Sequence, residues 1–510
     1  MTSTIPAPER YPGSAAQLHA LFSFQFSTVS PRFARWFRWI LIGLGVVVLT
    51  LIALSATAGP AVQDYRLLLP SAWLAVLISS TLAAIGAAGG RELLPRAQAS
   101  IYPITPATDY LGATLMLPFN ITWLLQSVAL LSATAWCTGW SWGMIPALLL
   151  TGLWIVSCTL VGQAVAWTIE LIRTSAIGAR LVVATGALLV AAVAWVVHED
   201  GLVRLLDAAP TGRYALVAAL GSDAKAELWP QAFGELLAAG ALALLIGLQL
   251  ARLRVRIRPR NRGVGEARPV RPRPDPDGVF TAVLRLDRAS VWRSAPLRRG
   301  VLILVLVPGV AAALASLDWV MVILLPGLVA SGAGLLFGVN AFCLDGPGAL
   351  WRSTLPAPPR LLLLVRGVVT AETCLTAAVL VVAIAVVRAP AVPSAGELTG
   401  VLVAMVAGPI HVTSHCLRWS VRNPHAATLR SERDQPAPPA AMAGYAARLA
   451  VGTTGMGLVL GVLGRIDVPV ASVLFGLMIV LLAARRVLRT VRLWEDPAVR
   501  GRVLATVSTA

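Results

Sequence analysis

The chain alternates between long apolar runs and short polar breaks. Many of the runs reach about 20 residues, the length at which a helix crosses the ~30 Å hydrocarbon layer of a membrane. The pattern predicts an all-α fold, a polytopic membrane helix bundle of about 12 transmembrane helices. The spans are expected near residues 36–58, 68–88, 110–138, 142–170, 176–197 and 231–251 in the first half, and near 299–317, 319–341, 361–387, 397–417, 445–464 and 468–485 in the second.

Composition supports a membrane protein. Hydrophobic residues make up 57% of the 510 residues and charged residues 13%, and the mean hydropathy is +0.77. A soluble protein of this length would need more charge to cover its surface. The net charge is +18, and Lys225 is the only lysine. Because the arginines lie in loops between spans, the charge indicates topology and contact with anionic lipids, with no role in binding nucleic acid.

The placement of arginine predicts the orientation of the chain. By the positive-inside rule, arginine-rich loops face the cytoplasm. This places both termini in the cytoplasm and makes the chain a multi-pass protein of the cell (plasma) membrane. The arginine-rich segments are 89–109, 171–180, 252–298, 342–360, 418–448 and the tail after Arg485.

Six spans in each half give the two halves the same orientation, so a parallel repeat of two six-helix units is expected. Residues 1–251 form the first half, with an amphipathic segment AAQLHALFSFQFSTVSPRFARW before its first span. Residues 252–278 form a cytoplasmic linker rich in proline, with nine arginines. Residues 279–510 form the second half, with its own amphipathic segment FTAVLRLDRASVWRSAPLRRG and a basic tail. Both amphipathic segments are expected to lie in the membrane interface.

A P-x-x-P sequence occurs in each half, between the second and third spans. The first is in IYPITPATDYLG, with Pro103 and Pro106, and the second is in TLPAPPRLLLLV, with Pro356 and Pro359. Proline ends a helix and restricts the residue before it. Each loop is therefore predicted to be a short, stiff and bent element on the cytoplasmic side.

Ionisable and polar residues inside spans are candidate pathway residues, because burying them in lipid costs free energy. Asn120 and Glu372 lie at matching positions in the two halves, where they could line a shared vestibule or form helix-to-helix hydrogen bonds. Glu170 is the third candidate. It precedes Arg173 by three residues, so an ion pair at a helix end is the alternative.

His411 is the fourth candidate. His411 and His415 share a helix face, a spacing that can ligate a metal. No suitable third ligand is near except Cys416, which is expected to point elsewhere, so we predict interfacial histidines and no metal site. The five cysteines show no C-x-x-C and imply neither disulfides nor zinc.

Other patterns indicate packing and the absence of enzyme chemistry. GTTGMGLVLGVLG from Gly452 and SGAGLLFG from Ser331 predict close helix contacts.

A P-loop needs a lysine after its glycines, and Lys225 lies in a loop on the other side of the membrane without that motif. We therefore expect no catalytic residues and no enzyme activity in this chain. Tryptophans near span ends predict interfacial anchors, namely Trp36, Trp39, Trp73, Trp140 and Trp142.

Three features of the sequence occur together: six spans per half, an amphipathic segment before each first span, and a proline-containing loop, RELLPRAQASIYPITPATDYLG, with the weaker counterpart LWRSTLPAPPRLLLLVRG. With these features the sequence resembles the permease subunits of ABC transporters of the type-2 export class, in the fused two-half form of high-GC Gram-positive bacteria. The resemblance implies a translocation pathway that alternates its access as the halves rock about their interface. Soluble ABC ATPase subunits, two of them, would bind ATP and Mg²⁺, with no cofactor in this chain. The transported substrate stays open.

In that family the loop between the second and third spans holds a coupling helix that docks on the ATPase. The second loop has no charge pair matching Arg91 and Glu92, although Asp345 and Arg352 lie nearby. The implied contact residues are Arg91, Glu92, Pro95, Arg96, Tyr102, Pro103 and Pro106 in the first loop, and Trp351, Arg352, Pro356 and Pro359 in the second.

Three other interpretations remain. A secondary transporter of the major-facilitator type also has two parallel six-span halves, but its G-x-x-x-D-R-x-G-R-R-like loop is missing and buried acids are sparse. A membrane-embedded transferase or hydrolase would need a polar catalytic cluster. Loop 198–230 holds His198, Glu199, Asp200, Asp207 and Asp223, a mixture typical of a solvated loop. A non-transporting membrane anchor for an ATPase is the third.

Overall fold

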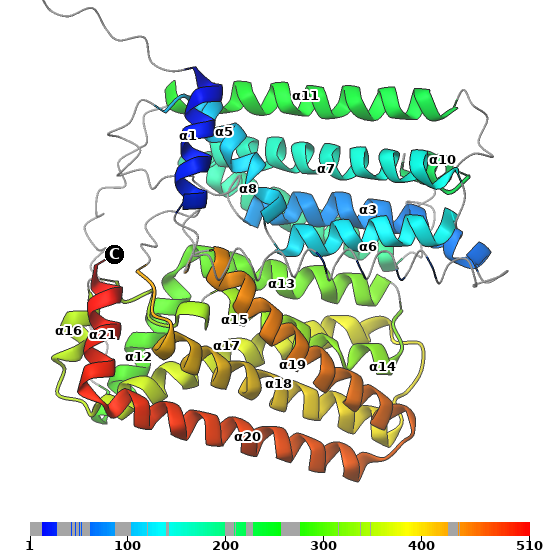
Figure 1. Ribbon diagram of the computed structural model, residues 1–510. Coiled ribbons are helices and arrows are strands. Elements are labelled where there is room, and N and C mark those ends of the chain that lie inside the picture. Colours follow the sequence, from blue (N-terminus) through cyan, green and yellow to red (C-terminus); the bar gives the residue numbers. More distant parts are fainter. Residues whose placement is uncertain are drawn as a thin grey trace, which may run out of the picture. The chain divides into compact units, whose positions relative to one another are not determined.

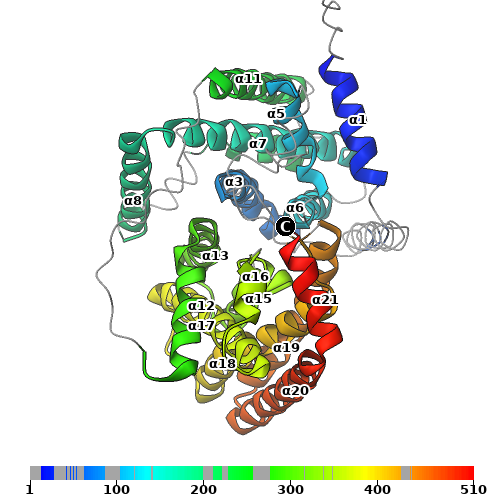
Figure 2. The same cartoon turned by 90° about the vertical axis from the view of Figure 1, so that its left-hand side faces the viewer.

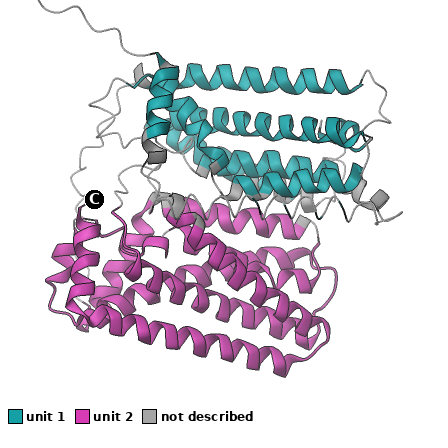
Figure 3. Cartoon of the chain, in the orientation of Figure 1, with its two compact units in different colours: residues 1–264 teal, residues 265–510 magenta. Residues whose placement is uncertain are grey.

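The computed structural model is a helical protein whose chain divides into two compact units, Met1–Val264 and Gly265–Ala510 (Figures 1 and 3). The division falls within the predicted linker. The part of the chain that the structure describes contains helices, turns and bends but no strand. It comprises residues 13–27, 42, 46, 50, 53, 62–86, 104–119, 121–138, 142–198, 209, 211–220, 228–256, 276–314, 316–336, 338–346, 348–426, 437 and 439–509.

Seven helices in the described residues are long and apolar enough to cross a membrane. A bent pair, Gly278–Arg293 with Leu297–Ala313, passes the same test as one unit. The chain is therefore a helical, multi-pass membrane protein, as predicted. The predicted first span, 36–58, lies almost entirely outside the described residues, and the count of twelve spans stays a prediction. The seven helices are Met144–Ile172, Leu228–Arg254, Trp319–Leu336, Pro359–Arg388, Ala395–Arg422, Gly444–Arg465 and Pro469–Glu495.

Unit 1 is built around α7, which contacts α3, α6, α10 and α11. Trp73 of α3 stacks on Trp154 of α7 with ring centroids 5.2 Å apart, and the Trp154 indole donates to the carbonyl of Trp73 at 3.1 Å. Its helices are α1 (Ser14–Ser27), α3 (Val62–Gly86), α5 (Pro106–Leu115), η2 (Leu117–Phe119), α6 (Ile121–Thr138), α7 (Met144–Ile172), α8 (Ala176–His198), α10 (Thr211–Leu220) and α11 (Leu228–Arg256).

Two sequence predictions for unit 1 need correction. Trp73, expected as an interfacial anchor, is fully buried in the core, whereas Trp142 is 89% exposed. The predicted span 110–138 is broken into α5, η2 and α6. Pro118 lies in the break, and proline cannot donate the backbone hydrogen bond that a continuous helix needs there.

A third correction concerns residues 198–230, expected as a solvated loop. The structure forms α10 within it, and one face of α10, with Ala215, Val217 and Ala218, is buried against α3 and α7. Its other face is polar: Tyr214 donates to Glu235 of α11 at 2.9 Å, and Arg213 pairs with Glu235 at 3.2 Å. An apolar face hidden among charged residues explains why the mixed composition suggested a loop.

Unit 2 is a bundle in which α18 is central and contacts α15, α17, α19 and α20 (Figure 1). At one end of the bundle lie the helices α12, α16 and α21, away from the apolar middle (Figure 1). Its helices are α12 (Gly278–Arg293), α13 (Ala295–Leu314), α14 (Trp319–Val322), α15 (Leu325–Leu336), η4 (Gly338–Asn340), α16 (Gly348–Ser353), α17 (Pro359–Ala385), η5 (Val386–Arg388), α18 (Ala395–Arg422), α19 (Pro439–Arg465), α20 (Pro469–Glu495) and α21 (Pro497–Ser508).

Both P-x-x-P sequences end by starting a helix. Pro106 is the first helical residue of α5, after the N-cap Thr105, and Pro359 is the first helical residue of α17. Proline suits this position because its fixed φ matches the helix and its missing N–H would have no partner there. The second proline of each motif therefore acts as a helix start.

The predicted small-residue contacts are present in unit 2. A Cβ at Gly334 of α15 would lie 2.8 Å from Val412 of α18 and 3.2 Å from Leu449 of α19. Gly338 faces Cys416 in the same way, whereas Gly455 of α19 has no atom within 4 Å of a Cβ. Most of these glycines thus set helix spacing, while Gly455 does not.

We expect Gly334→Val to lower the stability of the protein by about 1–3 kcal/mol, because the added methyls overfill a packed contact between three helices. Gly455→Val is the matched control, since it also places a branched residue in a helix interior but meets open space. The measurement is the thermal unfolding midpoint of both variants in detergent micelles. Equal midpoints would contradict the packing described.

Candidate functional site

The segment between α15 and α17 corresponds to the second predicted coupling loop. It leaves the bundle through η4, turns at residues 341–346, forms α16, and returns through a turn and bends at residues 354–357 to Pro359. Its start is tied to α18, because Ser420 accepts from the Ala341 N–H at 2.8 Å. Gly346 has φ +47°, a left-handed conformation that favours glycine, and it turns the chain into α16.

A buried cluster of two arginines and two aspartates holds this loop in place. Arg352 of α16 forms a two-pronged ion pair with Asp287 of α12, in which Nη2 donates to Oδ2 at 2.9 Å. Arg366 of α17 donates to both carboxylate oxygens of Asp345, at 2.7 and 2.9 Å. Cross-contacts of 3.3 Å join Arg352 to Asp345 and Arg366 to Asp287. We call these four residues the ion cluster.

The ion cluster is electrically balanced and closed to solvent. Its side chains are 10% exposed or less, and Asp287 is fully buried. Two positive and two negative charges offset one another, so the desolvation cost is met only while all four are present. The guanidinium of Arg366 also donates to the Ala341 carbonyl at 3.0 Å. The cluster therefore couples α12, the 341–346 turns, α16 and α17 into one charged joint.

An apolar layer supports the same loop from α20 and α21. Phe342 stacks on Trp494 with ring centroids 5.0 Å apart, and the Trp494 indole donates to the Pro359 carbonyl at 2.9 Å. Ala349 of α16 packs into the same core as Val503 and Val507 of α21. Figure 2 shows α21 beside α16 at this end of unit 2.

The outer side of α16 is apolar and exposed. Leu350 and Trp351 are 53% and 61% exposed, whereas Ala349 and Arg352 on the inner side are buried. Exposed aromatic side chains held on a rigid base are typical of protein contact sites. The arrangement can present an apolar knob to another protein and pass a displacement of that knob to α12 and α17.

The structure places the predicted contact residues of this loop, while their contact with an ATPase stays a prediction. Trp351 and Pro356 are exposed, and Pro359 starts α17. Arg352, expected as a partner contact, instead points inward and belongs to the ion cluster. Sequence reasoning missed Asp287 and Arg366 altogether. The available signal was an aspartate within a basic amphipathic segment and an arginine two turns inside an apolar span, each of which needs a buried partner.

The first predicted loop lies mostly outside the described residues. Of its predicted contact residues only Pro106 is described. Gln17 of α1 accepts from the Thr105 N–H at 3.2 Å and from the Thr108 hydroxyl at 2.8 Å, which ties the start of α5 to α1. The predicted residues outside the described part are Arg91, Glu92, Pro95, Arg96, Tyr102, Pro103 and the pathway candidate Asn120.

The acidic pathway candidates form ion pairs. Glu170 pairs with Arg173 at 3.2 Å, which is the helix-end pair given as the alternative. Glu372 of α17 accepts from Nε of Arg288 on α12 at 2.8 Å, so the helix-to-helix contact is the arrangement observed. This pair adds a second link between α12 and α17, half-exposed, beside the ion cluster.

The histidine candidates lie together within α18. The rings of His411 and His415 are 4.6 Å apart, and a Cβ at Gly452 would lie 2.8 Å from Nε2 of His411. Cys416 points away from them, to the Tyr445 hydroxyl at 2.6 Å, as predicted. Among the described residues no three His, Cys, Asp or Glu side chains form a group that could hold a metal.

Comparisons of the chain with known protein families, with curated proteins and with solved structures find no match.

We expect Arg366→Ala to destabilise the protein by about 3–5 kcal/mol, because it leaves a buried carboxylate without its partner. Arg360→Ala is the control on the same helix, where the exposed side chain forms no ion pair in the described chain, and it should change the stability by less than about 0.5 kcal/mol. Unfolding in detergent micelles gives both values. Replacing Arg366 and Asp345 together with methionine and leucine should recover part of the loss, since no charge then stays unpaired.

A thiol-labelling experiment tests the burial of the loop. Cys343 is 3% exposed, and burial raises the pKa of its thiol to about 12. Because the thiolate is the reactive form, maleimide labelling of a variant that keeps only Cys343 should stay slow between pH 7 and 9. Unfolding in dodecyl sulfate should make it fast. Rapid labelling of the folded protein at pH 9 would contradict the buried position.

Proposed function

We propose that the chain is the membrane permease subunit of an ABC-type exporter. In this proposal it supplies the translocation pathway, and separate soluble ATPase subunits supply the energy. The observation that carries the proposal is the geometry of α16. A short helix presents Leu350 and Trp351 outward, while its inner side is locked to α12 and α17 by the ion cluster.

A docking helix has to transmit force as well as bind. A flexible loop would absorb a displacement, whereas a charged joint with four buried members resists it, since breaking any pair strands a charge. Through Arg352 a movement of α16 reaches α12, and through Arg366 and Asp345 it reaches α17. The Trp494 contacts carry it to α20. These contacts connect the exposed side chains Leu350 and Trp351 to helices of membrane length.

A shared feature of the two units supports the parallel repeat that belongs to this proposal. In unit 1 helix α1, which lies in the predicted amphipathic segment, is hydrogen-bonded to Thr105 and Thr108 at the end of the first P-x-x-P and the start of α5. In unit 2 the amphipathic helix α12 is bonded to α16 and α17, on either side of the second P-x-x-P. The repeat predicts a second coupling element in residues 91–106.

The chemistry of ATP hydrolysis is assigned to the partner. The sequence has no lysine in a P-loop context, so we place nucleotide and Mg²⁺ on the ATPase subunits and no catalytic residue in this chain. Both termini and the α12, α16 and α21 end of unit 2 would then face the cytoplasm of the cell, where the ATPases are. The arginine-rich composition of that end agrees with the positive-inside rule.

The decisive experiment is affinity purification of the full chain from its native membrane, followed by mass spectrometry. We expect a soluble P-loop ATPase to be recovered with it. Replacing Leu350 with Ser and Trp351 with Ala should lower the recovery more than about tenfold, because an aromatic contact residue contributes about 2 kcal/mol or more. The unfolding midpoint of this variant should stay unchanged, since both side chains are exposed.

The control removes a more exposed apolar pair at the opposite end of unit 2. Val387 and Val392 are 76% and 91% exposed, and replacing both with Ser should leave ATPase recovery intact. Equal losses in the two variants would contradict a docking role for α16. Recovery of no ATPase with the unmodified chain would overturn the permease proposal and favour a secondary transporter.

A further inference from the structure

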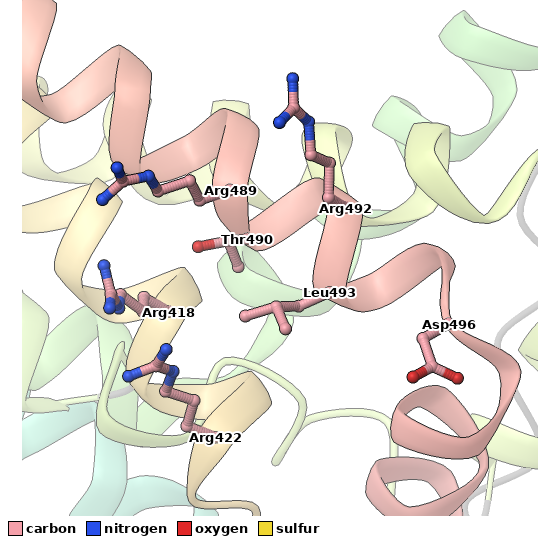
Figure 4. Close-up of a pocket in the computed structure, with 7 residues that line it drawn as sticks. All are labelled: Arg418, Arg422, Arg489, Thr490, Arg492, Leu493 and Asp496. Carbon is pink, nitrogen blue, oxygen red and sulfur yellow. The ribbon is translucent and has the colours of Figure 1, made fainter.

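A pocket with four arginines lies at the charged end of unit 2, where α18 and α20 end. Arg418 and Arg422 line it from α18, and Arg489 and Arg492 line it from α20 (Figure 4). Thr490 and Leu493 also line it, and its volume is about 410 Å³, within the range of about 300–1,000 Å³ usual for small-ligand sites. We call it the arginine pocket.

The chain offsets only part of the positive charge of the arginine pocket, because four arginines and one carboxylate line it. Arg418 is near enough to Arg422 and Arg489 to be repelled by both. In the described part of the chain, no ion pair joins these three arginines or Arg492 to a carboxylate. Like charges held together raise the free energy of the folded state unless an anion lies among them.

The one carboxylate at the pocket is already engaged. Asp496 is the N-cap of α21 and accepts from the Ala498 N–H at 2.9 Å. Figure 4 shows it on the far side of Leu493 from Arg418 and Arg422. The ion cluster, by contrast, balances its arginines within the chain. The two arginine groups of unit 2 therefore differ: the ion cluster is balanced within the chain, whereas the arginine pocket keeps an excess of positive charge that an anion from outside can offset.

Guanidinium groups bind phosphate, as they bind carboxylate, through paired hydrogen bonds. Two sources of phosphate exist, a lipid headgroup and a soluble phosphate. The position of the pocket favours the lipid. α18 and α20 are both of membrane length, so the ends at which their arginines gather lie at the level of the headgroups.

The surface of α20 next to the pocket suits acyl chains. Only 17% of its most apolar stretch is buried, against 61% for α18. Leu481 and Leu488 are 60% and 62% exposed. Arg485 and Arg492 lie on the same face of the helix as these leucines, with Arg485 between Leu481 and Leu488. The face is apolar as far as Leu481 and then carries arginines, the order expected where acyl chains give way to headgroups, and a soluble phosphate would not need the apolar part.

We propose that the arginine pocket binds the phosphate of an anionic phospholipid, whose acyl chains lie along the exposed leucines of α20. The lipid neutralises Arg418, Arg422 and Arg489 and fixes the junction between α20 and α21. This inference does not depend on the ATPase partner or on the direction of transport.

The test uses the full-length protein, stripped of lipid in detergent, with phosphatidylglycerol, phosphatidylcholine or inorganic phosphate added. Phosphatidylglycerol should raise the unfolding midpoint and remain bound in native mass spectrometry, and the two other additives should not. In a variant with Arg418, Arg422 and Arg489 replaced by Gln, the affinity for phosphatidylglycerol should fall by at least about tenfold, because the loss of one charge-assisted hydrogen bond alone costs about that factor.

The matched control removes the same charge elsewhere on unit 2. Arg293, Arg360 and Arg502 are exposed, and replacing them with Gln should leave phosphatidylglycerol binding unchanged. Without lipid, the pocket variant should unfold at the same or a higher temperature than the unmodified chain, because the repulsion is relieved. A purely structural role of these arginines would lower that temperature instead, and this result would count against the proposal.

Three results would overturn the proposal that the arginine pocket binds an anionic phospholipid. Equal binding of phosphatidylglycerol by the pocket and control variants would show that net charge alone attracts the lipid. Equal stabilisation by inorganic phosphate at the same concentration would assign the pocket to a soluble anion. Unchanged lipid binding together with loss of a co-purifying acidic protein in the pocket variant would assign it to that protein.

Discussion

The ion cluster is the interaction on which the charged end of unit 2 depends. Asp287, Asp345, Arg352 and Arg366 come from four separate segments, and each one is acceptable in a buried position only because the others are there. The cluster decides which side of α16 faces inward and therefore which residues are exposed. The amphipathic helix α12 is held against α17 by the same joint. Contact with lipid alone would leave it free to rotate or slide.

Arginine has two different uses in unit 2. In the ion cluster each guanidinium meets a carboxylate of the chain, and the result is a fixed geometry. At the ends of α18 and α20 the guanidinium groups lie near one another, and the result is a positive electrostatic potential that attracts an anion. Composition cannot distinguish the two uses, because both appear as arginine near the end of an apolar run. The difference arises from which helices the fold brings together.

The sequence predicted the membrane helices of unit 2 well, because hydropathy over a long window reflects a strong constraint: lipid-exposed backbone must be helical. The predicted span 397–417 lies within α18, and 361–387 nearly coincides with α17. Prediction failed where local chemistry competed with hydropathy. Pro118 interrupts an apolar run that looked continuous, and α10 hides an apolar face among charges.

The sequence predicted where the candidate site lies in the chain, but it did not predict the ion pairs that hold it. The prolines located the loop, and Trp351, predicted as a contact of the ATPase, is exposed on it. The role of Arg352 could not be predicted, because its partner Asp287 is 65 residues away in sequence and the pairing depends on how α12 packs on α17. Short-range spacing did predict the Glu170 and Arg173 pair, since three residues along a helix fix that contact without any tertiary information.

The order of synthesis gives the apolar support of α16 a temporal consequence. Val503 and Val507 of α21 follow α16 by roughly 150 residues. At about 5–20 residues per second of translation, the helix emerges on the order of 10 s before its cover exists. During that interval the inward side of α16, which later packs on α21, is as uncovered as the outward side. Assembly with any partner at this helix is therefore timed by the translation of a distant part of the chain.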